Sequence, residues 1–244
     1  MTQIKTLLAA PVLLALAATS AFADVNQPQE IVDRPRTTPA SQITVGGDVS
    51  FEKFGDANFS ALRVLGLYGV NEKLEVGASY AFALKEFEAK GDVQIHAAYG
   101  LVDGNLSAAA TLDFGYSLLA EGLDPLALGA EVQFKVNDKL VVYTPGQQLL
   151  IGLEEPNAIG LTIPVGIGYQ VSPQIFAHVD TNIADIEIKD TGGSAFIGAD
   201  RTPLAVGAFF SPSNTMDFGA TLGFPNLEDA GDFLYVVGSA RLHM

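Results

Sequence analysis

Residues 106–117 read LSAAATLDFGYS, and their apolar and polar side chains alternate. One parity holds Leu106, Ala108, Ala110, Leu112, Phe114 and Tyr116, and the other holds Ser107, Ala109, Thr111, Asp113, Gly115 and Ser117. Successive side chains of a β-strand point to opposite faces of the sheet, so a period of two predicts a strand with two unlike faces.

The same alternation recurs along the chain and predicts about twelve strands in all. They cover residues 42–53, 59–70, 73–85, 90–102, 105–118, 124–136, 139–152, 158–171, 174–185, 201–211, 215–224 and 232–243. Each segment is long enough to cross a bilayer, which takes a tilted strand roughly 9–11 residues. Pro145-Gly146 interrupts the segment 139–152, whose two faces therefore stay unassigned.

Tight turns alternate with connections that are mostly longer. The tight turns carry the Asn, Asp, Gly and Pro residues that short hairpins need, and they cover residues 71–73, 103–105, 137–139, 172–173 and 211–214. The longest connection is 186–200. The stretches 70–74, 102–106 and 136–140 share the form Val-(Asn/Asp)-x-(Lys/Asn)-Leu, which we interpret as a repeated hairpin rather than a propeller blade.

The N-terminal residues divide into two parts. Residues 1–23 combine Lys5, an apolar stretch and Ala21-Phe22-Ala23, which is the pattern of a cleaved secretory signal peptide. Residues 24–41 contain several prolines and charges, and we expect a flexible, solvated periplasmic tail there. A plug or a periplasmic docking peptide is the alternative for this tail. The remaining residues, 42–244, form the predicted barrel.

Charged side chains fall almost entirely on the face opposite the bulky apolar residues. A basic side chain at mid-depth on a lipid-facing surface costs about 2–4 kcal/mol, so a membrane makes this segregation necessary. Lys53 and Asp185 fall on the apolar parity, but both lie at strand ends. The inward-facing candidates for lining a lumen are Asp48, Arg63, Glu75, His96, Asp113, Glu131, His178, Asp180 and Asp217.

Composition excludes several other classes of protein. The 28 acidic residues outnumber the 13 basic ones, for a net charge of −15, which argues against nucleic acid as a partner. There is no cysteine, and hence no disulfide framework or thiolate metal site. Mean hydropathy is positive, yet after the signal peptide no apolar run reaches the length of a spanning helix.

Signal peptide, amphipathic strands, alternating tight and longer connections, and a strand at the C-terminal end together resemble the outer-membrane β-barrel proteins of Gram-negative bacteria. The resemblance covers residues 42–244. It implies an all-β fold, a single antiparallel up-and-down transmembrane β-barrel surrounded by outer-membrane lipid, with both termini on the periplasmic side. Such proteins usually end in Phe or Trp, whereas this chain ends in Arg241-Leu242-His243-Met244.

The function that we expect is passive passage of small polar or cationic solutes, because the inward charges on the assigned strands are mostly acidic. The inward glycines either leave a water-filled passage or relieve crowding between strands. A non-conducting structural or surface-binding barrel, and a secreted soluble β protein, remain alternatives.

Catalysis is not expected. His178 and Asp180 share the inward face and could orient a general base in a hydrolase, but no serine lies in a Gly-x-Ser-x-Gly setting. His96, His178 and Asp180 could hold a metal only if their strands faced each other, and no spacing requires it. We expect neither metal nor cofactor.

Overall fold

The computed structural model describes residue 25 and residues 27–84, 91–118, 121–154, 158–189 and 203–244; side chains are described in β11 only up to Ile186. The predicted signal peptide, residues 1–23, lies outside these ranges. Among the described residues, no helix is long and apolar enough to cross a membrane.

The regular secondary structure of the described residues is β-strand, apart from two short 3₁₀ turns. The strands are β1 (Ile43–Phe54), β2 (Ala57–Gly69), β3 (Leu74–Ala83), β4 (Gly91–Val102), β5 (Leu106–Ser117), β6 (Gly122–Leu123), β7 (Leu126–Lys135), β8 (Leu140–Thr144), β9 (Leu149–Ile151), β10 (Ile159–Ser172), β11 (Ile175–Lys189), β12 (Leu204–Ser213), β13 (Met216–Phe224) and β14 (Phe233–His243). The 3₁₀ turns are η1 (Ile31–Asp33) and η2 (Leu227–Asp229).

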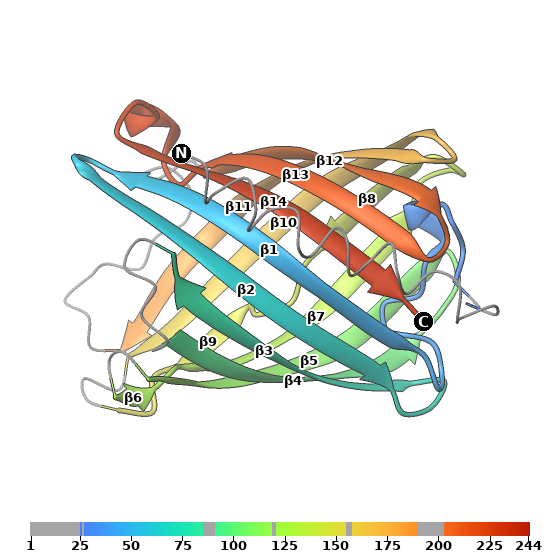
Figure 1. Ribbon diagram of the computed structural model, residues 1–244, viewed down its shortest axis with the longest axis horizontal. Helices are drawn as coiled ribbons and strands as arrows, with labels where there is room; N and C mark the ends of the chain where they lie inside the picture. Colours follow the sequence, from blue (N-terminus) through green and yellow to red (C-terminus); the bar gives the residue numbers. More distant parts are fainter. Residues whose placement is uncertain (1–24, 26, 85–90, 119–120, 155–157, 190–202) are drawn as a thin grey trace.

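The strands form one antiparallel sheet that closes on itself (Figure 1). The first strand pairs with the last, from Thr44 opposite His243 to Phe54 opposite Phe233. The short strand β6 extends the line of β7 along β5, while β8 and β9 both lie between β7 and β10. The described part of the chain is therefore an up-and-down barrel of twelve strand positions. The pairing of β1 with β14 removes the two free edges that an open sheet of these strands would have, and a lipid environment requires such closure.

The predicted strand boundaries lie within three residues of the observed ones at nearly every strand end. The predicted interruption of 139–152 is confirmed, because β8 and β9 flank residues 145–148. The exception is β11, which continues to Lys189, so the predicted loop 186–200 starts too early. Residues 190–200 of that loop lie outside the described ranges.

Two of the repeated turns have the same hydrogen-bond pattern. In both, the asparagine Oδ1 accepts hydrogen bonds from the backbone N–H groups two and three residues later. Asn71 Oδ1 accepts from Lys73 and Leu74, and Asn137 Oδ1 accepts from Lys139 and Leu140. The third turn uses Gly104 at φ +131°, a conformation that favours glycine. The interpretation as a repeated hairpin is confirmed.

The apolar face of each strand points outward and the polar face points inward. Leu112, Ile163 and Val206 are exposed, with Leu112 at 41 %. Most polar residues of the opposite parity are shielded, with Asp217 at 5 %, whereas the Arg63 side chain is 46 % exposed and lines the internal cavity. Exposed aromatic side chains lie near both barrel ends, among them Tyr99 beside the tight turns and Phe51 near the other end. This arrangement matches the lipid-facing surface and aromatic girdles of a transmembrane barrel.

The segment 27–41 does not form the solvated tail that we expected. Figure 1 shows it in blue at the barrel end where the C-terminus lies. Its 3₁₀ turn η1 contacts β10, and Val32 is fully buried against Val141 and Phe176. The prolines and charges that indicated a solvated tail instead shape a segment that follows the inner wall.

Ile95→Lys is expected to lower the free energy of unfolding by about 2–4 kcal/mol, the cost of a basic side chain facing lipid. Ile95 lies near the middle of β4 and is 57 % exposed. The matched control is Ser79→Lys on the neighbouring strand, which lines the internal cavity and should cost much less. Chemical denaturation in lipid vesicles measures both. Equal losses would contradict a lipid-facing exterior.

Candidate functional site: a charged cavity inside the barrel

A cavity of ≈ 690 Å³ lies inside the barrel, between the N-terminal segment and the inner faces of the strands. Charged side chains of both signs line it. The basic ones are Arg34, Arg36, Arg63 and Arg241, and the acidic ones are Glu75, Asp113 and Glu131. His96 and His243 also line it, and most of the residues around the cavity are polar or ionisable.

The basic side of the cavity is organised by one carboxylate. Asp48 on β1 is buried between two arginines of the adjacent strands β2 and β14. Arg63 Nη2 lies 2.6 Å from Asp48 Oδ2, and Arg241 Nη2 lies 2.7 Å from Asp48 Oδ1. One negative charge therefore faces two positive charges, which leaves this part of the wall net positive.

The acidic side is organised by one histidine. His96 on β4 lies between two carboxylates, with Nδ1 2.7 Å from Asp113 Oδ1 and Nε2 3.2 Å from Glu75 Oε1. His96 and Asp113 face each other directly in the β4–β5 register. The backbone N–H of Thr38 also donates to Glu75 Oε2 at 2.6 Å. This contact ties the N-terminal segment to the acidic wall.

Arg36 and Glu131 place opposite charges on the same cavity. Arg36 Nη2 donates to the Arg34 carbonyl at 3.0 Å. Burial lowers the pKa of the Arg36 guanidinium, and the Glu131 carboxylate opposes that shift. The charges of Arg36 and Glu131 therefore partly compensate each other.

Residues 145–148 project from the wall into the cavity. Pro145 cannot donate to a neighbouring strand, so the ladder between β7 and its partner is broken here. The Gln148 side-chain amide instead satisfies the backbone of Ala130, which has no strand partner on this side of β7. Its Oε1 accepts from the Ala130 N–H at 2.6 Å, and its Nε2 donates to the Ala130 carbonyl at 2.8 Å. Gln147 Nε2 meanwhile reaches Asp113 Oδ2 at 3.1 Å. The sequence pattern predicts an interruption here but not this inward projection.

A second polar group lies on the wall formed by β8 and β10–β13, and its members do not line the cavity. His178 Nδ1 is 2.6 Å from Asp180 Oδ2, and Tyr143 donates its hydroxyl to Asp180 Oδ1. The His178 ring stacks with the rings of both Phe176 and Phe209. These rings fill part of the lumen.

Several inward glycines on this wall make room for large side chains. A Cβ at Gly207 would lie 2.4 Å from His178 Nε2, and one at Gly166 would lie 2.3 Å from the Tyr143 ring. Here the glycines relieve crowding rather than leave open space. Around Gly160 on β10 nothing lies within 4 Å of such a Cβ, so open space remains at that position and the two explanations hold at different places.

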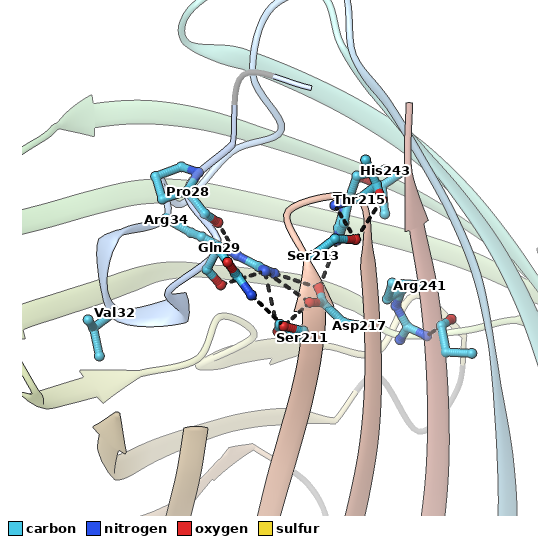
Figure 2. Close-up of polar contacts among 12 residues, drawn as sticks. Pro28, Gln29, Val32, Arg34, Ser211, Ser213, Thr215, Asp217, Arg241 and His243 are labelled. Carbon is cyan, nitrogen blue, oxygen red and sulfur yellow. Dashed lines mark hydrogen bonds and ion pairs between the residues drawn. The ribbon is translucent and has the colours of Figure 1, made fainter. Parts of the chain in front are cut away.

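The third group joins the N-terminal segment to the C-terminal strands (Figure 2). Arg34 donates to both oxygens of Asp217, with Nη1–Oδ2 at 2.5 Å and Nη2–Oδ1 at 2.9 Å. Ser211 Oγ donates to Asp217 Oδ1 at 2.6 Å, and His243 Nε2 lies 2.7 Å from Oδ2. Arg34, Ser211 and His243 thus all contact the buried Asp217 carboxylate, and these charge-assisted hydrogen bonds fix its position.

The structure thus sorts the nine sequence-derived candidates into separate groups. Arg63, Glu75, His96, Asp113 and Glu131 line the cavity, and Asp48 holds Arg63 in place. His178 and Asp180 belong to the second group and Asp217 to the third. His96 and His178 do not converge. Among the described residues, no cluster of three or more His, Cys, Asp or Glu side chains is arranged to hold a metal ion.

Sequence reasoning missed the contributions of the N-terminal segment. Arg34, Arg36 and Thr38 line the cavity, although their segment lies outside every predicted strand. The one available signal was two closely spaced arginines in a chain with only 13 basic residues. Such a pair shows no periodicity, so it could not be assigned to the lumen.

Comparison with known proteins identifies the fold. No protein-family model matches the sequence, and no curated protein matches it either. Similar solved structures include a KdgM porin in complex with disordered oligogalacturonate (8% identity, TM-score 0.59, 82% of this chain and 98% of that chain) and a NanC porin (9% identity, TM-score 0.57, 82% and 97%). A further KdgM porin structure has 9% identity and a TM-score of 0.56 over 81% and 98%.

The chain therefore has the closed-barrel fold of Gram-negative outer-membrane proteins, as the sequence-level resemblance predicted. At these identities the likeness is one of fold.

Asp48→Asn is expected to destabilise the barrel by about 2 kcal/mol, because two guanidinium groups lose a charged hydrogen-bond acceptor. Asp185→Asn is the control: Asp185 is exposed and accepts a long bond of 3.4 Å from Thr162 Oγ1. Asp185→Asn should lower the free energy of unfolding by no more than about 0.5 kcal/mol. Denaturant titration of both variants in one detergent provides the measurement, and a stable Asp48→Asn protein would contradict the assigned role of Asp48.

Proposed function

We propose that this protein is an outer-membrane channel for the passive passage of small polar solutes. The observation that carries the proposal is the cavity of ≈ 690 Å³ inside a barrel with an apolar exterior, lined by charged and amide side chains. An interior of this kind is wet, because polar groups in a cavity of such size retain water. The fold that this chain shares with porins supports a channel function.

The charges around the cavity bear on which solutes pass. The strands alone indicated an acidic lining and a preference for cations. With the N-terminal segment in place, four arginines and three carboxylates line the cavity. Arg63 and Arg241 lie on β2 and β14, and Glu75 and Asp113 lie on β3 and β5, so charges of opposite sign occupy neighbouring parts of the wall and the potential along the passage is not uniform. The proposed solutes are therefore polar molecules, not cations alone.

A non-conducting barrel is the second candidate, and one observation favours it. The N-terminal segment and residues 145–148 both occupy part of the lumen. A barrel filled in this way could serve a structural or surface-binding role. Electrical recording separates the two candidates directly.

An enzymatic role is not proposed. The His178–Asp180 pair belongs to a hydrogen-bonded group with Tyr143, and the His178 ring stacks with two phenylalanine rings. His178 Nε2 faces Thr221 Oγ1 at 3.5 Å, and neither residue lines the cavity. The group packs the interior of the wall, away from the space that a solute would occupy.

We propose that the tight-turn end, with both termini, faces the periplasm. The alternation of tight turns and longer connections is the pattern of bacterial outer-membrane barrels, whose short turns are periplasmic. The backbone N–H of Ile43 donates to the Met244 carbonyl at 2.8 Å, so the start and the end of the barrel strands meet at this end.

Purified protein in planar lipid bilayers is expected to give discrete current steps, because a water-lined passage conducts ions. Ser79→Trp should reduce the step size, since Ser79 lines the cavity on β3 and an indole ring would fill part of it. The control is Val76→Trp on the lipid-facing side of the same strand, which should conduct like the unsubstituted protein. No current in the unsubstituted protein or either variant would exclude a channel.

A further inference from the structure

The N-terminal segment, residues 27–41, is fastened inside the barrel by apolar packing. Val32 is fully buried and packs with Val141 and Phe176. Two glutamines clamp its backbone: Gln133 Nε2 donates to the Val32 carbonyl at 2.9 Å, and Gln170 Oε1 accepts from the Val32 N–H at 3.4 Å. Because the two glutamines bind the N–H and the carbonyl of the same residue, they fix the position of the segment along the barrel axis.

Arg34 fastens the same segment by charge, as Figure 2 shows. Besides its two bonds to Asp217, Arg34 donates from Nε to the Pro28 carbonyl at 2.9 Å and from Nη2 to the Gln29 carbonyl at 3.0 Å. Its side chain is 10 % exposed and that of Asp217 is 7 % exposed. One guanidinium therefore holds the segment's own backbone and binds it to the barrel wall.

The segment changes both the width and the charge of the lumen. It occupies space that the barrel strands would otherwise enclose, and it contributes Arg34 and Arg36 to the cavity lining. Without it the strands contribute Arg63 and Arg241 against Glu75, Asp113 and Glu131. Removal of the segment would therefore leave a wider cavity with an acidic excess.

We infer that residues 27–41 are an internal constriction, held in place by the Arg34–Asp217 pair, that sets the conductance and the charge selectivity of the passage. This inference rests on the proposed channel function. It assigns to the segment a role that neither the barrel fold nor its porin likeness supplies.

The first test compares two variants that break the same pair but change the local charge in opposite directions. Arg34→Gln removes a positive charge and Asp217→Asn removes a negative one. If the pair holds the constriction, both variants raise single-channel conductance by about twofold or more, because a wider pore passes more ions. The double variant should match either single one. Lys53→Gln is the control, since Lys53 binds the Gly231 carbonyl outside this segment.

A simple charge effect predicts a different result. In that case Arg34→Gln and Asp217→Asn would shift ion selectivity in opposite directions, and the double variant would restore the original value. Release of the segment instead raises conductance and shifts selectivity toward cations in both single variants, because Arg34 and Arg36 leave the lumen with the segment. Opposite shifts without a conductance increase would overturn the inference.

The second test locks the segment. The chain has no cysteine, so Val32→Cys with Val141→Cys introduces one possible disulfide between two residues that pack together. In the Arg34→Gln background, the oxidised protein should conduct like the unsubstituted one, and a reductant should restore the larger conductance. This reversal also guards against misfolding, because a misfolded barrel would not regain its original conductance on oxidation.

The outcomes separate the inference from the proposed function. Equal conductance in the unsubstituted protein, Arg34→Gln, Asp217→Asn and the locked form would overturn the inference and leave the channel intact. No current in any form would overturn the channel function, and the inference with it. Labelling of the single variant Val32→Cys by a water-soluble thiol reagent, faster with Arg34→Gln than without it, would support release of the segment; equal labelling would overturn it.

Discussion

The exclusion of charge and unpaired backbone from lipid governs the whole molecule. Each strand must complete its hydrogen bonds with neighbours, and β1 does so by pairing with β14, which closes the barrel. Each charged side chain within the bilayer must then point inward, where buried charges need partners. The groups built around Asp48, His96, Asp180 and Asp217 follow from this second requirement, because each combines a carboxylate with nearby donors.

The same requirement explains why the N-terminal segment lies inside the barrel. An acidic interior attracts a short segment with two arginines, and Arg34 and Arg36 supply positive charge next to Asp217 and Glu131. Apolar packing adds to this attraction where Val32 meets a patch of the inner wall. A tail that is polar by composition thus becomes part of the lumen, and it changes the balance of charge that the strands alone would present.

The interior is not uniform, and this decides how far it can serve as a passage. On the wall formed by β10–β13, glycines and aromatic rings interlock, as Gly207 does with His178, and little space remains. The cavity lies on the other side, between arginines held by Asp48 and the Glu75–His96–Asp113 group. The expected choice between water-filled space and relief of crowding is therefore resolved locally: each explanation applies to its own part of the wall.

The sequence alone determined the strands, their inward and outward faces, and the tight turns, because lipid on one side and water on the other impose a period of two on every spanning strand. Leu112 and Asp113 show how directly that pattern predicts burial. Tertiary structure decided what no periodicity encodes: the partners of each inward charge, the projection of residues 145–148, and the position of Arg34 beside Asp217. These features depend on which strands face one another across the lumen and on contacts between residues that are distant along the chain. A local sequence pattern encodes neither.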